Sequence, residues 1–64
     1  MSKVSIEGYI KVKSELRKAS KHVRAARQSI ERVLNEYRFL LFEHEERELE
    51  RMLIALRNME VYLG

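Results

Sequence analysis

Apolar residues recur every seven positions along half of the chain, and this repeat limits what the chain can fold into. One set starts at Tyr9, and a second set starts three residues later at Val12. They are the a and d positions of an uninterrupted heptad pattern, which predicts a long helix packed along a coiled-coil-like seam. The two sets are Tyr9, Leu16, Val23, Ile30 and Tyr37, and Val12, Ala19, Ala26, Val33 and Leu40.

The register of this repeat fails after Leu40, because its continuation would place His44 and Arg47 in the seam. A second apolar stripe, displaced by two positions, begins at Leu49. Two offset stripes in a chain this short indicate two helices that fold back on each other. We therefore predict an all-α antiparallel hairpin in one domain. Its parts are the domain 1–64, a long helix over 5–42, a turn at 42–45 and a shorter helix over 46–63.

Few local signals define the helix ends. Ser5 is a good N-cap residue, and Val4 and Tyr9 stand at the spacing of a hydrophobic staple. The turn lacks glycine and proline, although glutamates follow it where a helix start favours negative charge. Two other arrangements stay open: one continuous helix with a register slip, and a three-helix monomer broken near Ala19 and Ser20.

The chain has few means of stabilising so small a fold by itself. A chain of 64 residues buries only about 60% of its unfolded surface. This one has no cysteine for disulfides or thiolate zinc sites, and its two histidines are too few for a metal cluster. Self-association is the remaining route to stability, and no cofactor is expected.

The unequal lengths of the two helices predict which surface mediates that association. The helix over 5–42 would be about 57 Å long, and the helix over 46–63 about 27 Å. The shorter helix would cover roughly residues 25–42 and leave the earlier part of the seam bare. A second copy covering this part would give a homodimeric helical bundle. The expected interface residues are Tyr9, Val12, Leu16, Ala19, Val23 and Ala26.

Basic residues gather in the first part of the chain. Residues 1–27 hold eight Lys or Arg and two Glu, whereas residues 28–64 hold five Arg and eight Glu. A dense basic surface can neutralise phosphates and release counterions, so the pattern favours non-specific binding to DNA or RNA. An anionic protein partner and a merely solvated face are the alternatives. The candidate nucleic-acid-binding residues are Lys11, Lys13, Arg17, Lys18, Lys21, Arg24 and Arg27.

Four apolar residues lie off both stripes and form a second candidate surface. Phe39 and Phe42 fall away from the long seam on a helical wheel. Ile54 and Val61 lie opposite the stripe of the second helix. Such residues form either a further oligomer contact or a patch that docks a protein partner.

No pattern in the chain indicates catalysis, a metal site or a membrane span. His44 and Glu48 have the spacing of a helical ligand pair, but no further ligand is near. The serines lack histidine and acid partners, and no apolar run approaches the roughly 20 residues of a transmembrane helix. The N-terminus lacks the apolar core of a signal peptide, so the expected location is the cytoplasm. Binding of the basic helix to an anionic membrane ranks third, because its apolar face is thin.

These surfaces together predict the function. We expect a small, non-enzymatic, homo-oligomeric regulator that binds nucleic acid through the basic face of its long helix. The alternative is a protein-binding adaptor or inhibitor that uses Phe39, Phe42, Ile54 and Val61. The two differ in salt dependence, because phosphate binding weakens steeply with salt and apolar docking does not.

Overall fold

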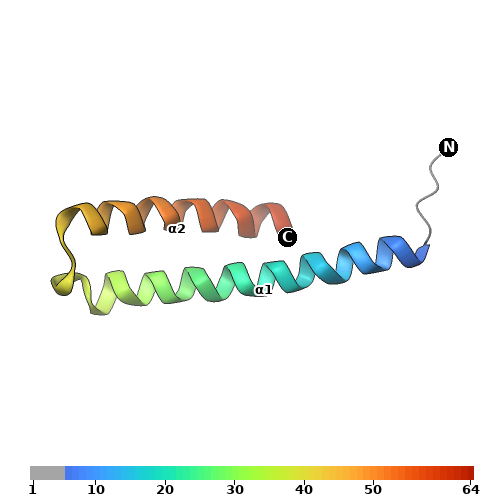
Figure 1. The fold of residues 1–64 in the computed structure, drawn as a ribbon, viewed down its shortest axis with the longest axis horizontal. Coiled ribbons are helices and arrows are strands. Elements are labelled where there is room, and N and C mark those ends of the chain that lie inside the picture. Colours follow the sequence, from blue (N-terminus) through green and yellow to red (C-terminus); the bar gives the residue numbers. More distant parts are fainter. Residues whose placement is uncertain (1–5) are drawn as a thin grey trace.

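Two antiparallel helices joined by a short connection make up residues 6–64, the part of the chain that the computed structural model describes (Figure 1). Helix α1 spans Ile6–Glu36 and helix α2 spans Glu43–Leu63, with one 3-10 turn, η1, at Arg38–Leu40. The overall dimensions are 55 × 18 × 13 Å. Since a helix with its side chains is about 10–12 Å across, the hairpin is two helices wide and one helix thick. Both broad faces of this single layer are therefore open.

The predicted all-α hairpin is confirmed, and the two other arrangements are not found. Helix α1 passes through Ala19 and Ser20 without a break, so a third helix does not form there. The chain also reverses direction after Glu36, so the offset of the two stripes does not arise within one continuous helix. Neither helix holds a stretch long and apolar enough to cross a bilayer within residues 6–64.

The predicted end of the first helix at residue 42 is wrong, because α1 stops at Glu36. The stop is made by an arginine and not by glycine or proline. Arg38 folds back so that its Nε donates to the carbonyl oxygen of Leu34 at 3.1 Å. Its Nη1 also lies 2.7 Å from Glu46 and 3.5 Å from Glu50 in α2. One side chain thus satisfies a carbonyl at the helix end and ties the connection to the next helix.

Helix α2 begins at Glu43, three residues before the predicted start. Phe42 is its N-cap, with extended backbone angles of φ −74° and ψ 158°. The Phe42 side chain has no acceptor, but the Glu45 carboxylate accepts the Phe42 N–H at 2.9 Å, which is half of a capping box. At the other end, Gly64 adopts a φ of 85° and donates its N–H to the backbone carbonyl oxygen of Glu60 at 2.9 Å. The N-cap and staple predicted at Ser5 and Val4 lie outside the described residues.

Leu34 is the one buried residue among residues 6–64, with 5% of its surface exposed. It directly follows the seam residue Val33 and so stands at the flank of the heptad seam, yet it lies at the centre of the helix contact. Half-buried residues continue this contact line along both helices. They include Val23, Arg27 and Ile30 in α1, and Leu49, Leu53, Leu56 and Leu63 in α2. Helix α2 therefore packs to one side of the heptad seam and leaves part of the seam exposed.

The first part of α1 extends beyond the end of α2. The last turn of α2 lies beside Ala19 and Val23, so α2 covers about 19–36 and not the predicted 25–42. The coverage shifts because both ends of the connection fall earlier in the sequence than predicted. Residues 6–18, here called the arm, project past the hairpin for about 20 Å (Figure 1).

Candidate functional site

The basic residues that the sequence singled out divide into two groups in the structure. Lys11, Arg17 and Lys21 are exposed on α1, and no ion pair joins them to another residue within 6–64. Lys13 lies 5.9 Å from the centre of the Tyr9 ring, a cation–π distance. Lys18 pairs with Glu15 of its own helix at 3.2 Å, and both side chains are well exposed. These five cations remain available to a ligand, since surface pairs of this kind contribute little.

Arg24 and Arg27 belong to the second group, because α2 already engages their charges. Arg27 hydrogen-bonds to Glu60 through Nε and to Glu31 through Nη1, the latter at 2.7 Å. Arg24 lies 3.7 Å from the same Glu60 carboxylate. Arg27 is half-buried between the helices. The predicted seven-residue basic face is thus shorter in the folded chain, and its free part lies on and next to the arm.

A row of charged contacts, here called the charged ladder, closes one edge of the hairpin. Its members are Arg27 and Glu31 from α1, and Arg57 and Glu60 from α2. Arg57 Nη2 donates to Glu31 Oε2 at 3.0 Å. The hydrogen bond from Arg57, with the nearby Arg27 charge, lowers the pKa of Glu31 below its usual value. The ladder therefore joins the helices best when its carboxylates are ionised.

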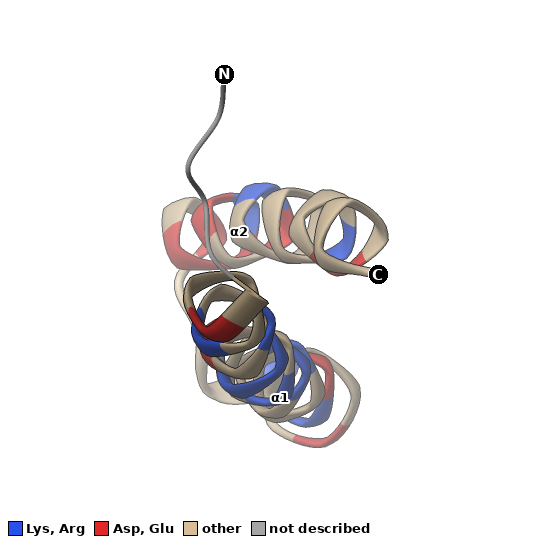
Figure 2. Ribbon diagram, turned by 90° about the vertical axis from the view of Figure 1, so that its right-hand side faces the viewer, with Lys and Arg blue, Asp and Glu red and all other residues tan. Residues whose placement is uncertain are grey.

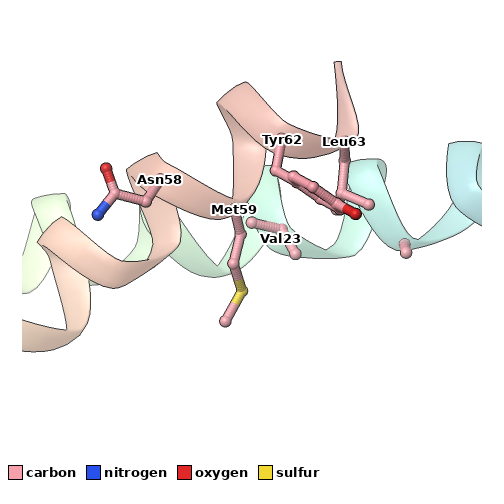
Figure 3. Close-up of a pocket in the computed structure, with 6 residues that line it drawn as sticks. Val23, Asn58, Met59, Tyr62 and Leu63 are labelled. Carbon is pink, nitrogen blue, oxygen red and sulfur yellow. The ribbon is translucent and has the colours of Figure 1, made fainter.

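The opposite edge of the helix contact is an open apolar groove. The groove consists of two adjoining hollows, and Met59 of α2 lines both of them. Figure 3 shows Val23 beside Met59 and Leu63, with the Tyr62 ring next to them and Asn58 extending away. The groove is lined by Ala19, Val23, Ala26 and Ile30 of α1, and by Met52, Ala55, Met59 and Tyr62 of α2. Nothing within residues 6–64 covers this apolar surface.

The six predicted interface residues follow one line from the arm into this groove. Tyr9, Val12 and Leu16 lie on the arm, and each is at least 39% exposed. Ala19, Val23 and Ala26 line the groove itself. The methionines and Tyr62 on the α2 side were not predicted as interface residues. Met52 and Met59 follow the helical spacing of the stripe that begins at Leu49, but both are exposed at the groove edge, whereas Leu53 is half-buried.

The four residues of the predicted docking patch do not come together. Phe39 and Phe42 lie at the connection, 80% and 71% exposed, and Phe42 stacks on His44 at a ring distance of 6.0 Å. Ile54 and Val61 lie on the outer side of α2 and are also exposed. Val61 is 19 residues after Phe42, about 28 Å along the helix. The connection therefore forms a separate apolar tip, to which Leu40 also contributes.

Charge is distributed unevenly along the length of the molecule. The arm holds four Lys or Arg and two Glu, a net of +2, whereas residues 19–64 hold eight of each sign and are neutral. Figure 2, which views the molecule from the end where α1 begins, shows mostly blue bands along the near part of α1 and both red and blue bands on α2. Across residues 6–64, no group of three His, Cys, Asp or Glu is placed to hold a metal ion. The exposed cations of the arm can attract an anion electrostatically.

Comparisons of the chain with models of known families, with curated proteins and with solved structures found no match.

Proposed function

We propose that this chain is a small, non-enzymatic helical regulator that associates with itself and binds nucleic acid through the basic side of α1. The proposal rests on the charge and position of the arm. It projects from a neutral hairpin, it carries a net charge of +2, and no part of α2 neutralises it. A second copy would double the number of cations and raise the affinity through avidity.

The spacing of the free cations suits phosphate contacts. Lys11, Arg17 and Lys21 lie on the part of α1 that turns away from the apolar seam, so binding and self-association use different sides of the helix. They span ten residues, about 15 Å of helix, which is enough to reach several phosphates of one strand. Contacts of this kind position a protein without reading bases, so the proposed binding discriminates little between sequences.

The first test changes Lys11, Arg17 and Lys21 to Gln. We expect the affinity for a short labelled DNA duplex and for single-stranded RNA to fall about tenfold or more, because glutamine cannot form charge-assisted hydrogen bonds with phosphate. The slope of log K against log salt should become shallower by up to about 2.7 per chain on duplex DNA, or about 0.9 for each phosphate that is no longer neutralised. Fluorescence anisotropy between about 50 and 200 mM salt measures both quantities.

The chain offers a matched control for this test. Arg32, Arg47 and Arg51 are also exposed, and changing them to Gln removes the same charge from the hairpin. Each of them pairs only with a glutamate of its own helix among the described residues. The control should bind nearly as well as the parent. Equal decreases in affinity for both variants would mean that net charge, and not the arm, determines binding.

A protein partner at the apolar tip is the second candidate function. The observation in its favour is the exposure of Phe39 and Phe42, since large aromatic side chains at an exposed turn are typical anchors of protein interfaces. If the parent chain binds neither DNA nor RNA at low salt, the nucleic-acid proposal fails. The apolar tip then becomes the leading candidate site, and changing Phe39 and Phe42 to Ser should abolish binding of the protein partner.

A further inference from the structure

The exposed seam of α1 has nearly the same order of side chains from either end. Taking Val23 as the centre, aromatic, branched and small residues occur in the same order on both sides, at distances that are equal for two pairs and differ by one residue for the other two. The equivalent positions are Tyr9 and Tyr37, Val12 and Val33, Leu16 and Ile30, and Ala19 and Ala26. Tyr37 still continues the helical hydrogen bonding, since its N–H donates to Val33 at 2.9 Å. A stripe with this order is complementary to itself when two copies run in opposite directions.

The lengths of the elements fit the same arrangement. If Val23 of one copy lies opposite Val23 of another, residues 6–18 lie opposite residues 28–40 of the partner. Residues 28–36 of that partner stretch are covered by α2, and Ile30 lines the end of the apolar groove nearest the connection. The groove residues of α1, 19–30, then lie opposite partner residues 16–27. The end of the arm and the stretch of α1 after it enter the groove, and the rest of the arm lies beside the partner's connection. Both exposed surfaces are covered by one two-fold arrangement.

Charge determines the direction of the pairing. The end of the molecule around the connection, residues 36–50, holds six Glu and two Arg, a net of −4. The arm at the opposite end carries +2. Antiparallel chains place each arm beside the acidic end of the partner, whereas parallel chains place like charges together at both ends. Complementary potentials favour the first arrangement and oppose the second.

We propose that the apolar groove binds α1 of a second copy, antiparallel and centred on Val23, to form a two-fold four-helix bundle. This inference rests on the self-association within the proposed function and specifies its direction and register. Leu16 of each copy then lies at the hollow formed by Ala26, Ile30 and Met52 of the other. The alanines at the centre allow the two long helices to approach closely. The outward cations of α1 stay exposed, so the bundle leaves the nucleic-acid surface free.

Cysteine cross-linking tests the register directly, because the natural chain contains no cysteine. In the antiparallel bundle, Val23→Cys cross-links with itself under mild oxidation. Tyr9→Cys and Tyr37→Cys do not cross-link alone, but they cross-link with each other when mixed. Parallel chains in register would also link Val23→Cys, but they would link Tyr9→Cys and Tyr37→Cys each to itself, and this outcome overturns the proposal. Ile54→Cys, on the outer side of α2, is the matched control and should stay unlinked.

A second measurement guards against variants that fold poorly. Glu7 is exposed on the arm, so a spin label at Glu7→Cys leaves the seam intact. The antiparallel register separates the two labels by about 48 Å along the helix axis, whereas parallel chains bring them within roughly 20 Å. A short label distance, or a monomer in sedimentation at micromolar concentration, rules out the bundle. Both experiments omit nucleic acid, so their result is independent of whether the arm binds phosphates.

Discussion

Glu31 is one of the residues through which the charged ladder joins the two helices. Its carboxylate accepts from Arg57 of α2 at 3.0 Å and from Arg27 of its own helix at 2.7 Å. Both donors favour the ionised form, and they lower the pKa of Glu31 in the folded chain. A carboxyl group whose pKa is lower in the folded state stabilises the fold fully above its usual pKa. That contribution disappears as the pH falls through the lower, folded-state value.

The stability of the hairpin should therefore decrease in acid, partly through Glu31. The Glu31→Gln variant should be less stable than the parent at neutral pH, and its stability should decrease less between about pH 7 and pH 3. Thermal unfolding followed by circular dichroism across this range measures the difference. Glu48→Gln is the control, because Glu48 pairs with Arg51 of its own helix and does not join the two helices. If the stability of the parent and that of Glu31→Gln decreased equally with falling pH, this role of Glu31 would be contradicted.

At the scale of the elements, the sequence predicted the existence of the two helices more accurately than the residues at which they end. The heptads from Tyr9 and the second stripe from Leu49 predicted two helices and their antiparallel packing, because periodicity reports the buried face directly. The end of α1 was missed by six residues, because no backbone signal marks it. The signal is the long-range contact of Arg38 with Glu46, which requires the two helices to be folded together.

The candidate surfaces show the same limit of sequence reasoning. Lys11 and Arg17 could be chosen as free cations, because their place on α1 follows from helical spacing alone. Arg27 could not be separated from them, because its partner Glu60 is 33 residues away in the sequence. Similarly, Met52 and Met59 fit the intrachain stripe by spacing. Their exposure at the groove edge depends on how far α2 rotates toward the ladder.

The connection provides a prediction at this scale. Arg38→Ala removes the hydrogen bond to the Leu34 carbonyl and both ion pairs with α2. We expect it to destabilise the hairpin by about 1 kcal/mol, a value that allows for the partial exposure of the side chain. Urea unfolding at neutral pH gives the change in the free energy of unfolding. Arg51→Ala should change it by less than about 0.5 kcal/mol, because Arg51 pairs only within α2 among the described residues. Equal effects would mean that Arg38 does not fix the turn.

For the whole molecule, the main physical question is what keeps the chain folded when residues 6–64 contain one buried residue. A two-helix hairpin one helix thick has no second layer, and the arm has no neighbour at all within residues 6–64. The arm extends a helix whose later part packs against α2, so it needs no new nucleation, but its free end can fray because no packing holds it. A partner on the seam of the arm would reduce this fraying. Assembly and helix content should therefore be coupled in this chain.

Leu16 offers the sharpest test of that coupling, because it lies on the seam of the arm and is partly exposed in the single chain. Leu16→Asp would bury an unpaired charge in the assembly, which costs several kcal/mol, so we expect monomers in sedimentation and a lower helical signal from the arm. Ser14→Asp introduces the same side chain on the opposite side of the arm, and should leave both measurements close to those of the parent. If Leu16→Asp keeps the parent's mass and helicity, the arm is stable alone and the seam is not the surface that joins the copies.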